Sequence, residues 1–246
     1  MLERYRFELA GIPANPFKYE WAVRIHGFLN HQISMDDAAR FHAFGDSRPY
    51  SLYLSRQRDG KTYLILNILN DRALCLRDVL LNSQSIQING LEKPVGILSM
   101  EQEEKRTMEE LTANEVKNQF DLHFLSPATY RKDNRFSNWF DLSRLLGNPL
   151  AKIKAFEGIT IPKDCFYQID NNIEIHRYNL KSYNYHVTKE GINSFYGGIS
   201  VRLHDCPELL LAQLNLVLRY AEFTGVGAKT TMGMGGFRIM EADDDG

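Results

Sequence analysis

The order of predicted strands and helices indicates an α+β fold made of two successive β-α-β-β-α-β units. Alternating strand patterns occur in two groups, helical patterns interrupt each group, and a polar segment at 108–115 separates them. We therefore expect tandem ferredoxin-like (RRM-like) domains, each βαββαβ, at residues 1–112 and 113–246. The duplication rests on element order alone, since we find no strong internal sequence repeat.

The first unit opens with a strand, because residues 3–10 read ERYRFELA and alternate in polarity. Residues 17–33 have apolar side chains at helical spacing. Ser34 followed by two aspartates is typical of the start of a second helix, which we expect to end near Phe44. The remaining elements expected are a hairpin of strands 50–56 and 62–69, a helix at 71–82 and a strand at 95–106.

The second unit repeats this order and closes with a strongly amphipathic helix and a short strand. Its helix at 139–156 should be interrupted near Gly147, which is followed by Asn and Pro. The other expected elements are a strand at 118–125, a hairpin of strands 173–188 and 192–203, a helix at 207–223 and a strand at 237–240.

Composition describes a soluble globular protein of 246 residues, with 43% hydrophobic residues. No apolar run approaches the length of a membrane span, so no membrane partner is expected. The first residues are charged and alternating, which predicts a strand and not a signal peptide. The three cysteines are widely spaced and lack a CxxC pattern, which favours a reducing cytoplasm and argues against a disulfide framework or a zinc site.

The formal net charge of −2 counts mildly against a nonspecific nucleic-acid binder. Acidic residues gather at 101–110 and 241–245, however, so a basic groove elsewhere stays compatible with the sequence.

The most informative segment is TGVGAKTTMGMGGFR at 224–238, between the last helix and the last strand. Glycines allow close approach of the backbone to a ligand, and successive free N–H groups can bind an anion. Neither a P-loop nor a dinucleotide fingerprint fits, so the pattern favours a long polyanion; a mobile loop of turn residues is the alternative. The residues predicted to bind are Gly225, Gly227, Lys229, Thr230, Gly233 and Gly235.

A second candidate cluster joins His26, His42 and Arg48 within one helix-turn-helix segment. Two imidazoles can supply a base and an acid near neutral pH, and an arginine can stabilise a phosphate that gains charge. This set suits RNA cleavage without a metal, through attack of a ribose 2′-hydroxyl on the adjacent phosphate. A helical histidine is otherwise an ordinary surface or half-buried residue.

A third cluster, YRKDNRF at 130–136, contains Arg131 and Lys132 beside aromatic residues. Arginine and lysine hold phosphates, and aromatic rings stack on unpaired bases. The alternative is a solvated loop whose aromatic residues belong to the core.

Three stretches carry a family resemblance: AEFTGVGAKTTMGMGGFRI, RFHAFGDSRPYSLYLS and WAVRIHGFLNHQI. The chain resembles the CRISPR-associated endoribonucleases of the RAMP (repeat-associated mysterious protein) superfamily, and the HGFL wording is similar to type III-associated members. The resemblance implies RNA binding and antiviral defence, with metal-independent cleavage of precursor CRISPR RNA within its repeats. The products it implies carry a 2′,3′-cyclic phosphate and a 5′-hydroxyl, and no cofactor or metal is implied.

The resemblance also implies residue roles. His42 matches the principal catalytic histidine, Arg48 the residue that stabilises the phosphate, and His26 a position that varies in the family. Lys229 and its glycines match the RNA-binding loop. Which histidine is base and which is acid stays open.

Repeat RNA is the implied partner, a type III effector complex is a candidate transient partner, and a homodimer is a further candidate. The alternatives are a noncatalytic RNA-binding subunit of a CRISPR ribonucleoprotein and a metal-dependent nuclease or cyclase.

Overall fold

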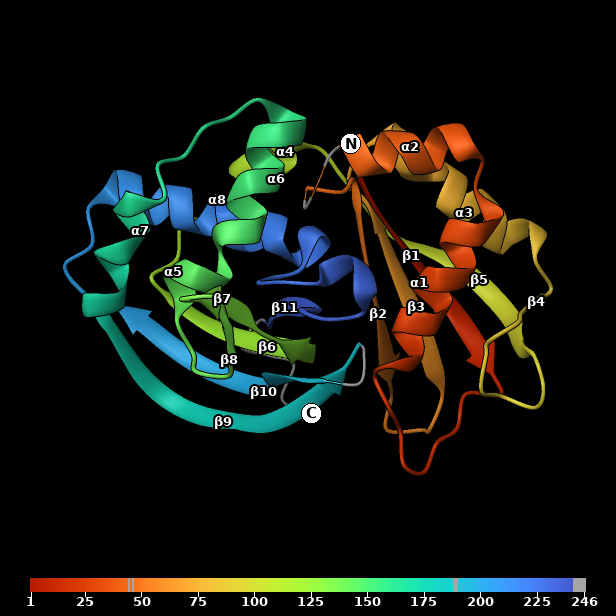
Figure 1. Ribbon diagram of the computed structural model, residues 1–246. Coiled ribbons are helices and arrows are strands. Elements are labelled where there is room, and N and C mark those ends of the chain that lie inside the picture. Colours follow the sequence, from red (N-terminus) through yellow and green to blue (C-terminus); the bar gives the residue numbers. More distant parts are fainter. Residues whose placement is uncertain (44, 46, 188–189, 241–246) are drawn as a thin grey trace.

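Two antiparallel sheets, each with its own helices, lie side by side in the computed structural model (Figure 1). The structure describes residues 1–43, 45, 47–187 and 190–240. The predicted α+β fold of tandem ferredoxin-like units is confirmed. All strands of the first sheet precede residue 112 and all strands of the second follow residue 113, so we retain the division at 112/113 as a proposal.

The first sheet has the strand order β2-β3-β1-β5-β4. Its strands are β1 (Leu2–Ala10), β2 (Tyr50–Arg56), β3 (Thr62–Ile68), β4 (Ser85–Ile86) and β5 (Val95–Arg106). Its helices are α1 (Trp21–Gln32), α2 (Met35–Ala43) and α3 (Leu74–Asn82), and a 3-10 turn, η1 (Asp71–Ala73), precedes α3. The edge strand β4 was not predicted, because a two-residue strand is too short to show alternation.

The two faces of β1 serve different purposes. Tyr5, Phe7 and Leu9 point to one face and join the apolar cluster that includes Ile25 of α1 and Leu76 of α3. The opposite face packs toward the second unit, so β2 and β3 are buried almost throughout. Strands covered on both faces lose the simple alternation of a half-exposed strand.

The second sheet has the order β11-β6-β10-β9, with a separate two-stranded sheet of β7 and β8. The strands of the second unit are β6 (Gln119–Ala128), β7 (Tyr130–Lys132), β8 (Arg135–Ser137), β9 (Ile173–His186), β10 (Gly191–Leu203) and β11 (Phe237–Met240). The helices of this unit are α5 (Leu142–Leu145), α6 (Gly147–Glu157), α7 (Asp164–Tyr167) and α8 (Glu208–Thr224), with 3-10 turns η2 (Ile169–Asn171) and η3 (Thr230–Met232), and helix α4 (Met108–Thr112) lies just before the division between the units.

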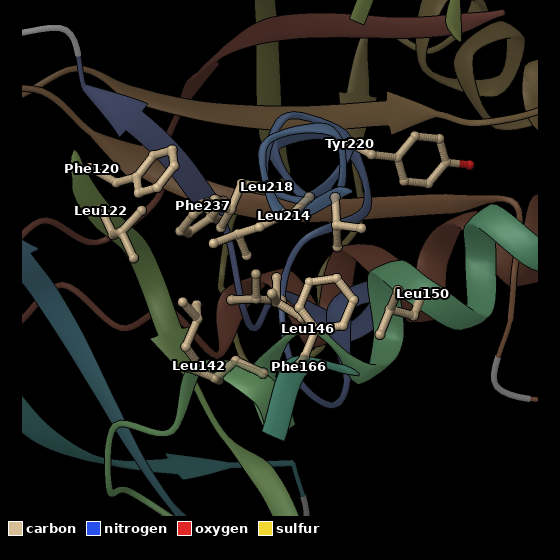
Figure 2. Packing of buried hydrophobic residues seen from close by; sticks show 14 of the residues in the cluster. Phe120, Leu122, Leu142, Leu146, Leu150, Phe166, Leu214, Leu218, Tyr220 and Phe237 are labelled. Atoms are coloured by element: carbon tan, nitrogen blue, oxygen red, sulfur yellow. The ribbon is translucent and has the colours of Figure 1, made fainter. Parts of the chain in front are cut away.

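The core of the second unit lies between β6 and the helices that cover it. Figure 2 shows side chains of α8, β6 and the α5–α7 segment meeting there. Leu210, Leu214 and Leu218 of α8 are buried at a spacing of four residues, whereas Leu209 is 72% exposed. The leucine-rich helix is therefore amphipathic, as its sequence predicts.

The sequence did not predict the β7–β8 hairpin, helix α4 at the boundary between the units, or the short helix α7. Residues 130–136 form the β7–β8 hairpin, and its turn places Asp133 and Asn134 at φ 48° and 61°. An Asp-Asn pair tolerates this left-handed conformation and is a usable hairpin signal. Helix α4 occupies the expected polar boundary, and the reciprocal cap between Thr107 and Glu110 was its signal.

A buried arginine connects the two units. Arg4 of β1 is fully buried and donates to the Asn67 side chain at 2.9 Å and to the Glu222 carbonyl of α8 at 2.6 Å. It also pairs with Glu104 and lies 4.5 Å from the centre of the Phe223 ring. Burial lowers the pKa of Arg4, but a guanidinium stays protonated at any physiological pH.

Replacing this arginine should weaken the whole fold. We expect Arg4→Met to lower the free energy of unfolding by about 3 kcal/mol, because it leaves buried acceptors without donors. Urea unfolding measures the change. Arg6→Met is the matched control on the same strand: Arg6 is 30% exposed and its ion pairs with Glu101 and Glu103 are worth about 1 kcal/mol or less. Equal losses in the two variants would contradict the role given to Arg4.

Candidate functional site

The glycine-rich segment leaves α8 at Gly225 and returns to the sheet at β11. Its glycines are required by close packing within the protein. Gly227 and Gly235 have φ of 68° and 71°, and a Cβ at either position would lie 2.0 Å and 2.1 Å from the carbonyl oxygens of Thr129 and Val226. Only glycine tolerates both conditions at once.

The expectation that this loop offers a row of free N–H groups is wrong for much of its length. Six of its N–H groups donate to protein carbonyls at 2.8–2.9 Å, namely those of Gly225, Val226, Gly227, Ala228, Met232 and Gly235. These hydrogen bonds make the loop a rigid part of the second unit. Its side chains and its surface around η3 are therefore what it presents to a ligand.

A groove of about 410 Å³ opens beside this loop and gathers three of the predicted cations. Arg48 comes from the segment before β2, Arg131 from β7 and Lys229 from the loop itself. No carboxylate occurs among its described lining residues. The lining is Gly45, Ser47, Arg48, Arg131, Phe136, Gly147, Asn148, Ala151, Gly227, Ala228, Lys229, Thr230, Thr231 and Met232.

The electrostatics of this groove favour a polyanion. Three cationic side chains can each neutralise a phosphate and release counterions. The amino-terminal end of α6, at Gly147 and Asn148, also lines the groove, and its helix dipole adds positive potential. Phe136 lies 5.0 Å from the Arg131 guanidinium, measured to the ring centre, which places an aromatic face beside the cation. Phosphates and bases could thus be bound together.

His26 lies on α1 close to the start of β2. Its Nδ1 is 3.2 Å from the Tyr50 hydroxyl, and the two rings are stacked with centres 6.3 Å apart. Only 8% of His26 is exposed. Burial, aided by the positive charge of Arg48, lowers the pKa of His26 to about 4. The imidazole is therefore neutral at pH 7, so it can accept a proton but is a poor donor.

The predicted catalytic residues converge in part. His26 and Arg48 lie close enough for the arginine to shift the histidine's pKa. His42 lies on α2, but its side chain is outside the described part of the structure, so its place in the cluster stays a prediction.

The predicted RNA-binding residues divide into two groups. Those that line the groove are Arg131, Gly227, Lys229 and Thr230. Gly225, Gly233 and Gly235 are buried in the fold of the loop, and Lys132 is exposed on β7 but is not part of the groove lining.

Sequence reasoning missed three residues near the groove. Tyr50 begins the strand after Arg48, and its position in the RFHAFGDSRPYSLYLS motif was an available signal. Asn148 was noted only as a helix interruption. Lys152 of α6 is fully buried, and nothing in its sequence context distinguishes it from a surface lysine.

Comparison with known proteins supports the resemblance. The family model "CRISPR-associated endoribonuclease Cas6" matches residues 122–237, which include Arg131 and the glycine-rich loop. A Streptococcus thermophilus protein described as CRISPR-associated endoribonuclease Cas6 is 22% identical over 231 residues, covering 91% of this chain and 93% of its own. The resemblance to the Cas6 family is confirmed.

Solved structures show the same fold. A Cas6 product complex superposes with a TM-score of 0.79 at 20% identity, covering 98% of this chain and 99% of that chain. Thermus thermophilus Cas6 superposes with a TM-score of 0.71 at 21% identity, covering 98% of each chain. The matched fold therefore spans both units, whereas the family model leaves out the segment with His26, His42 and Arg48.

The described residues contain neither a membrane-spanning helix nor a cluster of metal-ligating side chains. No described helix is both long and apolar enough to cross a membrane. No cluster of three or more His, Cys, Asp or Glu side chains that could hold a metal ion occurs within residues 1–43, 45, 47–187 and 190–240.

The low pKa of His26 predicts how the free energy of unfolding should depend on pH. The folded protein leaves His26 neutral down to about pH 4, whereas the unfolded chain binds the proton near pH 6.5. The unfolded state therefore binds more protons between these values, and stability falls as pH is lowered through this window, by up to about 3 kcal/mol from this residue.

Urea unfolding of the wild type and His26→Gln between pH 4 and 7 measures this effect. The stability difference between them should shrink as pH falls, because only the wild type loses this contribution. His31→Gln, on the exposed side of α1, reports the loss of a surface histidine. A difference for His26→Gln that does not vary with pH would contradict the burial of a neutral imidazole.

Proposed function

We propose that this chain is a metal-independent endoribonuclease that cuts precursor CRISPR RNA within its repeats. The observation that carries the proposal is the convergence of Arg48, Arg131 and Lys229 on one groove, with the neutral His26 beside Arg48. The named similarity to Cas6 endoribonucleases supports the substrate class, and a relative described as a product complex supports binding of the cleaved RNA.

The reaction is a transesterification within the RNA chain. A general base takes the proton from a ribose 2′-hydroxyl, and the 2′-oxygen attacks the adjacent phosphorus. The bond from phosphorus to the 5′-oxygen breaks, and a general acid protonates that oxygen. The products are a 2′,3′-cyclic phosphate and a 5′-hydroxyl, and DNA cannot react because it lacks the attacking hydroxyl.

The burial and low pKa of His26 bear on which proton-transfer role this residue would take. A pKa of about 4 leaves His26 almost entirely neutral at pH 7, which is the form that a general base needs and rules out a main role as acid, although the same low pKa makes the imidazole a weaker base than usual. His42 is then the candidate acid. Arg48 would hold the phosphate, since a guanidinium fork matches two phosphate oxygens and gains strength as charge develops. Arg131 and Lys229 would bind flanking phosphates, and Thr230, whose hydroxyl is bonded to Lys152, would support the rim of the groove.

The proposed setting is the cytoplasm, where the cut RNA would pass to an interference complex. Transient association with a type III effector complex and formation of a homodimer belong to the same proposal.

The second candidate function is a noncatalytic RNA-binding subunit. The 8% exposure of His26 favours it, since a general base must reach its substrate. Incubation of labelled repeat RNA in EDTA separates the two functions. Cleavage with cyclic phosphate ends supports the enzyme, and retention of uncut RNA supports the subunit. Cleavage that appears only when a divalent metal is added would instead indicate a metal-dependent nuclease.

Removal of the His42 imidazole should abolish most cleavage. We expect His42→Ala to lower the single-turnover rate by about 100-fold or more, because it removes a proton-transfer group, while the RNA dissociation constant changes by about twofold or less. His31→Ala is the control on the neighbouring helix. Full activity of His42→Ala would reject the catalytic assignment.

Loss of Arg48 should affect the chemical step more than binding. We expect Arg48→Ala to slow cleavage at saturating RNA by about 100-fold, because its contact strengthens as negative charge grows on the phosphate. Binding should weaken by about tenfold or less. Arg40→Ala is the matched control, because Arg40 is an exposed arginine of α2 that lies 3.7 Å from Asp37. Unchanged rates at saturating RNA for Arg48→Ala would exclude this role.

A further inference from the structure

Lys152 of α6 is a buried cation with an unusual set of partners. Its side chain is fully buried, and its ammonium group donates to three oxygens. These are the Tyr50 carbonyl at 3.1 Å, the Thr224 carbonyl at 3.4 Å and the Thr230 hydroxyl at 3.2 Å. The three acceptors belong to three different segments of the chain.

This arrangement is energetically costly. Among the described side chains, no carboxylate forms an ion pair with Lys152, and its partners are neutral oxygens. Burial accordingly lowers the pKa of Lys152 to about 7. A methionine or leucine would fill a buried helical position without this desolvation cost. The hydrogen bonds to the buried carbonyls of Tyr50 and Thr224 offset part of this cost, and they also connect α6 to two distant segments of the chain.

Two hydrogen-bond partners of Lys152 are sequence neighbours of cations that line the groove. Tyr50 is two residues from Arg48, and Thr230 directly follows Lys229. Both Arg48 and Lys229 line the groove, together with Ala151, the neighbour of Lys152 on α6. The buried ammonium group is thus bonded to the segment behind each of these two cations.

We propose that Lys152 is a positioning residue that fixes the separation of Arg48 and Lys229, so that both can bind the same stretch of RNA backbone. This inference rests on the proposed function for the identity of the ligand. Under this proposal Lys152 makes no direct contact with the RNA. It acts through Tyr50, the first residue of strand β2 in the first unit, and through Thr230 of the glycine-rich loop in the second unit.

The test is a double-mutant cycle on RNA binding. The probe is repeat RNA carrying 2′-O-methyl groups throughout, which removes the attacking hydroxyl and leaves the phosphates in place. Dissociation constants are measured for the wild type, Lys152→Met, Lys229→Ala and the double variant. We expect each single change to weaken binding by about tenfold, and the double variant to bind within about threefold of the single variants, because Lys152 acts through Lys229.

Three controls separate positioning from general stability. Lys154→Met removes an exposed lysine from the same helix. Ile153→Val trims a fully buried neighbour and should lower the melting temperature without changing RNA affinity. Thr230→Val removes one acceptor of Lys152 while keeping the side-chain shape, and should weaken binding in the same direction as Lys152→Met without adding to it.

The outcomes are distinct. Unchanged affinity of Lys152→Met, or losses that simply multiply in the double variant, would overturn the proposal. If Lys152→Met does not fold, Thr230→Val becomes the deciding variant. An unchanged RNA affinity of Thr230→Val would then overturn the proposal. If the wild type binds the methylated RNA but never cuts unmodified RNA, the proposed endonuclease function fails while the cycle still tests Lys152.

Discussion

The rest of the structure depends on the hydrogen bonds that side chains from three other elements make to the carboxyl-terminal end of α8. The carbonyl groups of residues 222–224 accept hydrogen bonds from Arg4 of β1, Ser51 of β2 and Lys152 of α6. Such carbonyls have no partners within the helix and carry the negative end of its dipole, so buried donors and cations stabilise them. One helix end thereby fixes the packing of the two sheets and the starting direction of the glycine-rich loop.

The loop continues this contact across the boundary between the units. A Cβ at Gly233 would lie 2.3 Å from the Cβ of Ala22 on α1, and one at Gly236 would lie 2.6 Å from the ring of Tyr53 on β2. The glycines therefore bring the second unit against the first as closely as backbone allows. Lys229, in the same loop, lines the groove together with Arg48, although the two residues are far apart in sequence.

Charge is distributed so that a protein of net charge −2 still has a basic groove. The glutamates of β5 are largely engaged with arginines outside the groove: Glu101 pairs with Arg6, and Glu103 pairs with both Arg6 and Arg238. The described groove lining contains none of these acids. Because exposed charges are screened within about 10 Å at moderate salt, it is this local balance, and not the net charge, that a bound phosphate experiences.

The sequence by itself predicted the α+β class, the order of elements in both units and the glycine-rich segment, and it placed Arg48, Arg131 and Lys229 in three separate candidate clusters; the groove that gathers them is a result of the tertiary structure. These features are local: periodicity, turn residues and family motifs can be recognised from residues that are close together in the sequence. Only the tertiary structure decided that the loop's N–H groups bond to the protein, that His26 is buried and neutral, and that Lys152 joins the two walls of the groove. These properties depend on which distant segments exclude water from a side chain, and desolvation is set by packing in three dimensions.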